Sequence, residues 1–287
     1  MKAFLKLLLK VIILFLIIIV GVYIGMQYGF KIHNSDINEV NNLTENEKID
    51  SDNDSNVSQN GFIITYEDEE YIAKTKKGYI AVSNKRNLPN IKNKNNQEVA
   101  DNIKNELVKI SDKYWDSVKE QSDEYVLDHE DYINDDTDLG VSYIYNSGFK
   151  NDKIISFTLT TEGSMGGVGW SGYEIYNFDI TTGELLSLKD IVEDYDKTID
   201  FITFEMEKHV KAEGLYDGVK EYVGVMEKTT LRKRIEEYID SGIWQFEDDS
   251  FIVTMPKYSI GNGAMGLITC SIDIKDMNEY LKTDYQI

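Results

Sequence analysis

An apolar run near the N-terminus constrains this chain of 287 residues more than any other feature of its sequence. Residues 11–30 read VIILFLIIIVGVYIGMQYGF, with no charge and with Gln27 as the only strongly polar side chain. As an α-helix, a run of this length rises roughly 30 Å, which matches the hydrocarbon thickness of a bilayer. The run therefore predicts a transmembrane helix that contacts the lipid bilayer through residues 11–30.

The charges on either side of the run predict its orientation. Lys2, Lys6 and Lys10 precede it and an acidic segment follows it, so residues 1–10 are expected in the cytoplasm and the rest of the chain outside. A cleaved secretory signal is the alternative. Because the run exceeds the ~7 to 15 apolar residues of such a signal and no Ala-x-Ala-like tripeptide closes it, we favour an uncleaved signal anchor at the cell membrane.

Residues 31–61 are dominated by Asn, Asp, Ser and Glu and show no apolar periodicity. A segment of this composition cannot bury enough surface to offset the entropy lost on ordering, which predicts a disordered acidic linker. Of the chain's net charge of -21, residues 1–33 contribute +4 and residues 34–60 contribute -6, which leaves -19 for residues 61–287. Such an acidic region favours a basic partner or cations and argues against nucleic-acid binding, although the acids could serve solubility alone.

Beyond residue 61 the hydrophobic pattern predicts an α+β fold of antiparallel β-meander sheets with packed helices. The expected strands are 62–66, 79–82, 141–145, 153–161, 173–180, 185–188, 244–246, 251–255 and 267–274. The expected helices are 97–120, 195–212, 218–240 and 275–282. The first helix is expected to begin with a capping box of Asn95 and Glu98, while the polar stretches 67–78 and 123–138 read as loops.

Reactive side chains form no catalytic motif in this sequence. The three histidines, His33, His129 and His209, are far apart, and neither a Gly-x-Ser-x-Gly elbow nor a phosphate-binding loop occurs. The acidic stretch 123–138 fails as an EF-hand calcium loop because Leu139 occupies the glycine position. We therefore expect no catalytic residue, metal ligand or cofactor, although carboxylates that converge in space stay possible among 51 acids.

The lone cysteine excludes an intramolecular disulfide framework. Cys270 lies in the alternating run LITCSIDI, on the same strand face as Ile268 and Ile272. This pattern predicts a buried, inert thiol.

Two glycine-rich segments each join a pair of predicted strands: 163–172 (GSMGGVGWSG) and 257–266 (KYSIGNGAMG). Both are expected to be hairpin connections longer than the minimal turn, with glycines that allow positive φ or a close backbone approach. One interpretation is that they are flexible hairpin tips. The other is that they carry exposed apolar and aromatic anchors for a partner, which are Met165, Trp170, Tyr258 and Met265.

A family resemblance emerges from the dispersed turn and hydrophobic positions. The residues that carry it are Tyr176-Asn177-Phe178-Asp179, Thr182-Gly183, Leu186, Leu188, Asp190-Ile191, Phe246, Asp249, Phe251-Ile252-Val253, Pro256, Tyr258, Ile260 and Ala264-Met265-Gly266. In this order they resemble the extracytoplasmic domain of RsiV, the anti-sigma-V factor, and the non-catalytic domains that precede the deacetylase in PdaC. The resemblance implies a PdaC-type N-terminal subdomain at 62–139 and an RsiV-like C-terminal subdomain at 140–287.

The resemblance also implies a function at the bacterial cell envelope. In RsiV this ectodomain binds lysozyme, a basic protein. Two differences limit how much of the RsiV function can be expected here. The ten residues before the predicted span are too few for a sigma-factor-binding domain. The segment Gly166-Gly167-Val168-Gly169 lacks the histidine that the family loop often carries. We therefore expect a binding or sensing module for a basic extracellular protein or a cell-wall component rather than an enzyme. The alternative is a carboxylate-based or cation-dependent envelope hydrolase.

Overall fold

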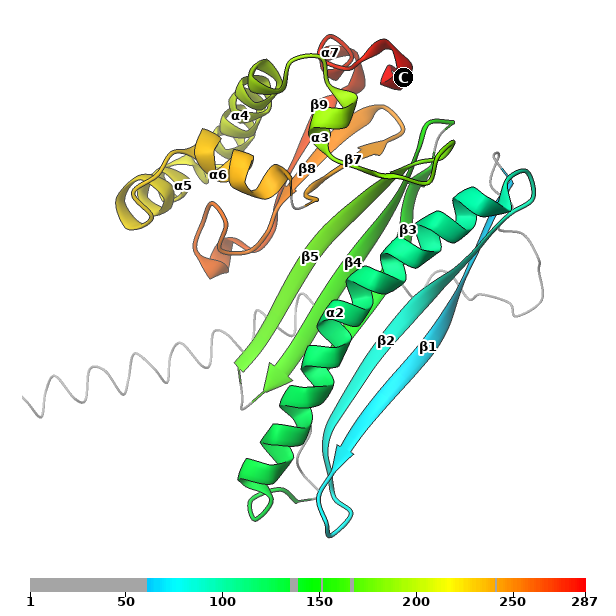
Figure 1. The fold of residues 1–287 in the computed structure, drawn as a ribbon. Helices are drawn as coiled ribbons and strands as arrows, with labels where there is room; N and C mark the ends of the chain where they lie inside the picture. The colour runs from blue at the N-terminus through cyan, green and yellow to red at the C-terminus, as the bar shows by residue number, and fades with distance from the viewer. Residues whose placement is uncertain (1–60, 135–138, 151, 166–167, 241) are drawn as a thin grey trace, which may run out of the picture. The chain divides into compact units, whose positions relative to one another are not determined.

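A computed structural model describes residues 61–134, 139–150, 152–165, 168–240 and 242–287 (Figure 1). The predicted anchor at 11–30 and nearly all of the predicted linker at 31–61 lie outside these residues. Within the described ranges, no helix combines the length and the apolar character that a membrane crossing requires.

Six strands form the larger sheet in the order β1-β2-β3-β4-β5-β6. They are β1 (Phe62–Lys74), β2 (Ile80–Asn93), β3 (Gly140–Lys150), β4 (Ile154–Met165), β5 (Val168–Asp179) and β6 (Leu185–Leu186). Neighbouring strands are antiparallel except β2 and β3, which run parallel and are connected through the long helix α2 (Gln97–His129). Figure 1 shows α2 lying lengthwise against this sheet. The predicted α+β class and the meander from β3 to β6 are confirmed, whereas the parallel pairing of β2 with β3 makes the larger sheet mixed rather than antiparallel throughout.

The remaining strands form an antiparallel sheet in the order β7-β8-β9, made of β7 (Trp244–Glu247), β8 (Ser250–Met255) and β9 (Ile268–Asp273). The helices of this part are α3 (Leu188–Ile191), α4 (Tyr195–Ala212), α5 (Tyr216–Glu221), α6 (Leu231–Ile239) and α7 (Ile274–Met277). A π-helical turn, η1 (Tyr222–Met226), and two 3-10 turns, η2 (Gly263–Met265) and η3 (Thr283–Tyr285), complete it. Helix α4 has the predicted bounds, whereas α7 is shorter than the predicted 275–282.

Helix α2 buries the predicted apolar face but extends nine residues beyond the predicted end. Its N-cap is Asn96, whose side chain accepts a hydrogen bond from Val99 N at 3.4 Å, so the expected cap at Asn95 is off by one residue. Ser122 and Val126 continue the buried face into residues 123–129, which were predicted to be a loop because of their acidic side chains. The acids of 123–129 occupy the other faces of the helix, where charge does not oppose helix formation.

Strand β1 also contradicts a loop prediction, because it continues through the acidic residues of 67–74. The register places Glu69 opposite Arg86 and Glu70 opposite Lys85. Arg86 pairs with Glu69 at 2.6 Å. Opposite charges directly across an antiparallel pair stabilise it, so this polar hairpin forms without the apolar alternation that the prediction required.

The helix predicted at 218–240 is instead broken into α5, η1 and α6. Lys228 adopts a left-handed backbone with φ 52°, which ends the helical turn before it. Thr230 then caps α6 by accepting a hydrogen bond from Lys233 N at 3.2 Å. The break arises from local capping chemistry that the apolar periodicity of this segment does not reveal.

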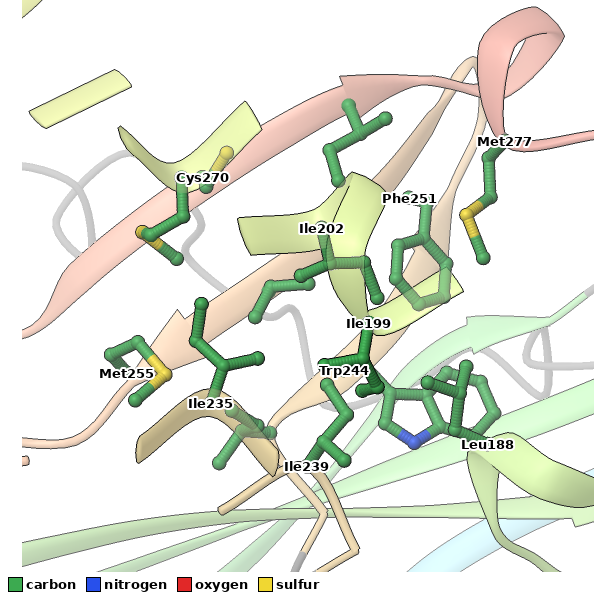
Figure 2. Close-up of a cluster of buried hydrophobic side chains, with 14 of the residues drawn as sticks. Leu188, Ile199, Ile202, Ile235, Ile239, Trp244, Phe251, Met255, Cys270 and Met277 are labelled. Atoms are coloured by element: carbon green, nitrogen blue, oxygen red, sulfur yellow. The ribbon is translucent and has the colours of Figure 1, made fainter. Parts of the chain in front are cut away.

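The core around the smaller sheet joins strands β7 to β9 to the helices that cover them. Figure 2 shows Trp244 among aliphatic side chains from α4 and α6, and its ring stacks on Phe251 with centroids 5.7 Å apart. Cys270 lies in the same cluster at 1% exposure, and burial raises the pKa of its thiol to about 11. The predicted buried thiol is confirmed, and it stays protonated at neutral pH.

Backbone and side-chain hydrogen bonds connect β5 to the segment that enters β7. Ile175 N donates to the carbonyl oxygen of Gly242 at 2.6 Å, and Asn177 Nδ2 donates to that of Trp244 at 2.8 Å. The expected subdomain boundary at 139/140 stays a prediction. Strands from both sides of it, β2 and β3, pair in one sheet.

Candidate functional site

The stem of the β4–β5 hairpin and the connection between β8 and β9 line one shared hollow of about 270 Å³. Its lining residues are Thr160, Glu162, Ser171, Gly172, Tyr173, Pro256, Lys257, Gly266 and Leu267. We call it the glycine-loop groove. It brings together residues from both glycine-rich segments, which lie about ninety positions apart in the sequence.

The first glycine-rich segment is mostly strand. Pairing of β4 with β5 continues to Met165 opposite Val168, which leaves only residues 166–167 between the strands. The expectation of a long connection here is therefore wrong, because glycines also allow two strands to approach closely. At Gly172 an added Cβ would lie 2.3 Å from Thr161 Oγ1 on the neighbouring strand. Met165 and Trp170 lie in β4 and β5, and the placement of their side chains is outside what the structure describes.

The second glycine-rich segment is the long connection that the sequence predicts, with η2 inside it. Two hydrogen bonds from other elements hold its first residues. Tyr222 Oη donates to the carbonyl oxygen of Tyr258 at 2.9 Å, and Arg234 Nε donates to that of Ser259 at 2.9 Å. Next to these contacts Tyr258 adopts φ 68°, and the residue is 58% exposed. A bulky side chain in the left-handed region costs about 1–2 kcal/mol, which the surrounding contacts must offset.

The two remaining side chains of this segment differ in their surroundings. The ring of Tyr258 lies over Gly263, where an added Cβ would lie 2.2 Å from the hydroxyl oxygen. Met265 is half-buried and packs against the core, with its thioether end beside Gly218 and Gly261. Tyr258 is thus exposed as predicted, whereas Met265 connects the loop to the core. Binding of a partner by either residue stays a prediction.

The polar groups of the groove can donate and accept hydrogen bonds. Burial raises the pKa of Tyr173, and the charge of Glu247 adds to this effect, so its phenol stays protonated. Glu162 and Lys257 supply one charge of each sign. The groove can therefore recognise polar and apolar groups together, and its charges favour no single sign of partner.

Metal ligands and histidines were the reactive groups considered from the sequence. No group of three or more His, Cys, Asp or Glu side chains there could hold a metal ion. His129 stacks on Tyr125 with ring centroids 4.3 Å apart and contacts the carbonyl oxygen of Tyr125 through Nδ1. His33 lies outside the described residues.

A second hollow of about 300 Å³ was not foreseen from the sequence. It surrounds Glu174 on β5 and includes Tyr114 from α2 and Asp240 from the end of α6. These residues belong to three separate segments, so no motif or spacing connects them before the chain is folded.

Comparisons with known proteins give a likeness of fold. No family model matches the chain, and no curated protein matches it significantly. A DUF3298 family protein from Bacteroides fragilis aligns with a TM-score of 0.54 and 12% identity over 79% of this chain and 96% of its own. A DUF3298 family protein from Pseudomonas aeruginosa aligns with a TM-score of 0.46 and 12% identity over 78% of this chain and 95% of its own. At 12% identity the first alignment shows a shared fold alone. The RsiV and PdaC resemblances are not confirmed.

Proposed function

We propose that this chain is a membrane-anchored binding or sensing module at the bacterial cell envelope, with the region after residue 61 outside the cell. Its docking site is the glycine-loop groove together with the exposed Tyr258, which directly follows the groove residue Lys257. Its partner is a basic protein such as lysozyme or a cell-wall component. In this proposal residues 11–30 contact the bilayer and residues 31–60 act as a tether.

The backbone of Tyr258 is the observation that carries the proposal. Tyr258 is exposed, yet its backbone has φ 68°, and the carbonyl oxygens of Tyr258 and Ser259 accept hydrogen bonds from η1 and α6. Strained residues persist where the surrounding structure determines them, and they concentrate at binding and catalytic sites. An exposed tyrosine on a loop with a fixed backbone loses little conformational entropy on binding, which is typical of an interface hot spot.

Two further features support a basic partner. Residues 61–287 carry a net charge of -19, which accelerates association with positively charged proteins. The resemblance to RsiV, whose ectodomain binds lysozyme, rests on Pro256, Tyr258 and Gly266 among other positions. All three belong to the second glycine-rich segment or adjoin it.

Binding to immobilised lysozyme and to soluble wall fragments tests the proposal, with the full chain in detergent micelles. We expect saturable binding to at least one of them, and binding to lysozyme should weaken with increasing salt because charge steers it. Absence of binding to both probes would contradict the proposal. Hydrolysis of the wall fragments would instead support the alternative envelope hydrolase.

A further inference from the structure

The second hollow, which we call the Glu174 pocket, lies where α2, β5, β6 and the residues after α6 meet. Six residues define its chemistry: Tyr114, Glu174, Tyr176, Leu185, Asp190 and Asp240. Its volume of about 300 Å³ is sufficient for one extended amino-acid side chain but small for a drug-sized ligand.

Glu174 is half-buried in this pocket, and both of its carboxylate oxygens accept hydrogen bonds from tyrosines. Tyr114 Oη donates to Glu174 Oε1 at 3.3 Å, and the hydroxyl of Tyr176 donates to Oε2. None of the ion pairs within the described ranges involves Glu174. Two neutral phenols stabilise the carboxylate by hydrogen bonding but do not neutralise its charge, so a cation that enters the pocket can pair with it.

The tyrosines orient the carboxylate without neutralising it. Burial raises the pKa of Tyr114 and Tyr176, and the negative charge of Glu174 raises both further, so the two phenols remain neutral donors. Other rings hold the two tyrosines in place. The ring of Tyr114 stacks on that of Tyr143 with centroids 6.0 Å apart, and the ring centroids of Tyr176 and Tyr145 lie 6.5 Å apart. Aromatic rings beside a carboxylate are the surroundings in which ammonium and guanidinium groups bind.

The rest of the lining also favours an organic cation. Asp190 and Asp240 add negative charge, although Asp190 caps α3 through Ser187 and Asp240 pairs with Lys189. Leu185 contributes apolar surface, and no Lys or Arg is among the residues that line the pocket. The ammonium group of Lys189 forms an ion pair with Asp240 at 3.0 Å and not with Glu174, so it does not neutralise the charge of Glu174. A bare metal ion fits poorly because the described acids form no group of three that could ligate one.

We propose that the Glu174 pocket binds an ammonium or guanidinium group carried on an alkyl chain. The cation pairs with Glu174 beside the hydroxyls of Tyr114 and Tyr176, and the alkyl chain lies along Leu185. Its source is either a lysine or arginine side chain of a partner protein or a free small amine. The site is distinct from the glycine-loop groove, and neither site requires the other.

Saturation-transfer NMR and calorimetry on the full chain test this site with capped amino acids as probes. N-acetyl-lysine amide and N-acetyl-arginine amide carry the cation, and N-acetyl-norleucine amide supplies the same apolar chain without it. We expect binding of at least one cationic probe and at least tenfold weaker binding of the norleucine probe. Glu174→Gln should reduce the affinity of the cationic probe at least tenfold, whereas Glu279→Gln, the same charge change at an exposed acid outside the pocket, should not.

A second variant tests the pocket independently in case Glu174→Gln does not fold. Leu185 is 43% exposed at the pocket, so Leu185→Trp should obstruct the pocket without touching the carboxylate. It should abolish probe binding while the melting temperature stays close to that of the wild type. A nine-residue peptide with one internal lysine separates the sources: binding as tight as that of the capped lysine indicates a partner's side chain, and binding of the capped lysine alone indicates a small amine.

Two results would overturn the inference. One is equal binding of the norleucine and cationic probes. The other is an unchanged affinity in a folded Glu174→Gln variant. Because the glycine-loop groove lies elsewhere, either result would leave lysozyme or wall-fragment binding by that groove unaffected.

Discussion

The side chain of Asn87 pairs with the backbone of Tyr145 as a neighbouring strand would. Asn87 Nδ2 donates to the carbonyl oxygen of Tyr145 at 2.9 Å, and Asn87 Oδ1 accepts from its N–H at 2.6 Å. Regular pairing between β2 and β3 is limited to residues 85–86 with 142–143. Asn84 acts similarly three residues earlier, where Oδ1 accepts from Val141 N at 3.0 Å. Buried side-chain amides therefore extend the parallel junction of the larger sheet.

Removal of the Asn87 amide should destabilise the fold strongly. Asn87→Ala leaves a buried N–H and a buried carbonyl of Tyr145 without partners, which predicts a loss of about 2–4 kcal/mol in the free energy of unfolding. Urea denaturation measures the loss. Asn105→Ala, at an exposed position of α2, is the matched control and should change stability by less than about 0.5 kcal/mol. If both substitutions changed the free energy of unfolding equally, the hydrogen bonds of Asn87 would make no net contribution to stability.

Gly242 should tolerate alanine much less than Gly214 does. Both glycines have positive φ, at 81° and 70°, but an added Cβ would lie 1.9 Å from the carbonyl oxygen of Ile175 at Gly242 and would meet nothing within 4 Å at Gly214. We expect Gly214→Ala to cost about 1 kcal/mol from backbone strain alone. Gly242→Ala should cost at least about 2 kcal/mol more because the clash disrupts the connection between β5 and β7. Similar melting temperatures for the two variants would contradict this.

Asp179 should make stability depend on pH in the acidic range. Burial raises its pKa, but hydrogen bonds from Thr181, Tyr285 and Thr182 outweigh this effect, so its pKa lies below the ordinary 3.8. A lowered pKa in the folded state means that the contribution of Asp179 is fully present above pH 3.8 and is lost as the pH falls through the folded-state value. The stability difference between wild type and Asp179→Asn should therefore shrink between pH 6 and pH 2.5, as measured by denaturation. A stability difference that stays constant over this pH range would show that folding does not favour the ionised form of Asp179.

The predicted membrane orientation leads to a separate experiment in intact cells. Protease added outside should release the region after residue 61 by cleavage within about 33–60, because the lysine bias places that segment outside. An epitope tag after Ile287 should be reached by antibody without lysis. Accessibility of the tag only after lysis would mean that the orientation is the reverse.

Sequence patterns predicted the elements whose periodicity is strong. Helix α4 has the predicted bounds because Ile199, Ile202 and Met206 recur on one buried face. The β3–β6 meander followed from alternating apolar residues and the turn at Thr182-Gly183. The polar part of β1 was missed because its stability depends on the cross-strand pair Glu69–Arg86, which only the register reveals.

The candidate sites were predictable in part. The two glycine-rich segments were identified from composition, and the structure places Ser171 and Lys257 from them on one groove. The strain at Tyr258 was not predictable, because it arises from hydrogen bonds donated by Tyr222 and Arg234, more than 20 residues away in the sequence. The Glu174 pocket was missed for the same physical reason: its members meet only through tertiary packing.

The affinity of a Tyr258→Ala variant for lysozyme tests the central claim most directly. Tyr132→Ala is the matched control, because this tyrosine is 81% exposed and lies outside both glycine-rich segments. With the full chain in micelles and lysozyme immobilised, we predict wild-type binding that weakens at least about tenfold in Tyr258→Ala, equivalent to about 1.4 kcal/mol, and less than twofold in Tyr132→Ala. Melting temperatures within about 2 °C of the wild type would show that both variants are folded. If both folded variants bind as tightly as the wild type, Tyr258 is not part of the docking site and the proposal is wrong.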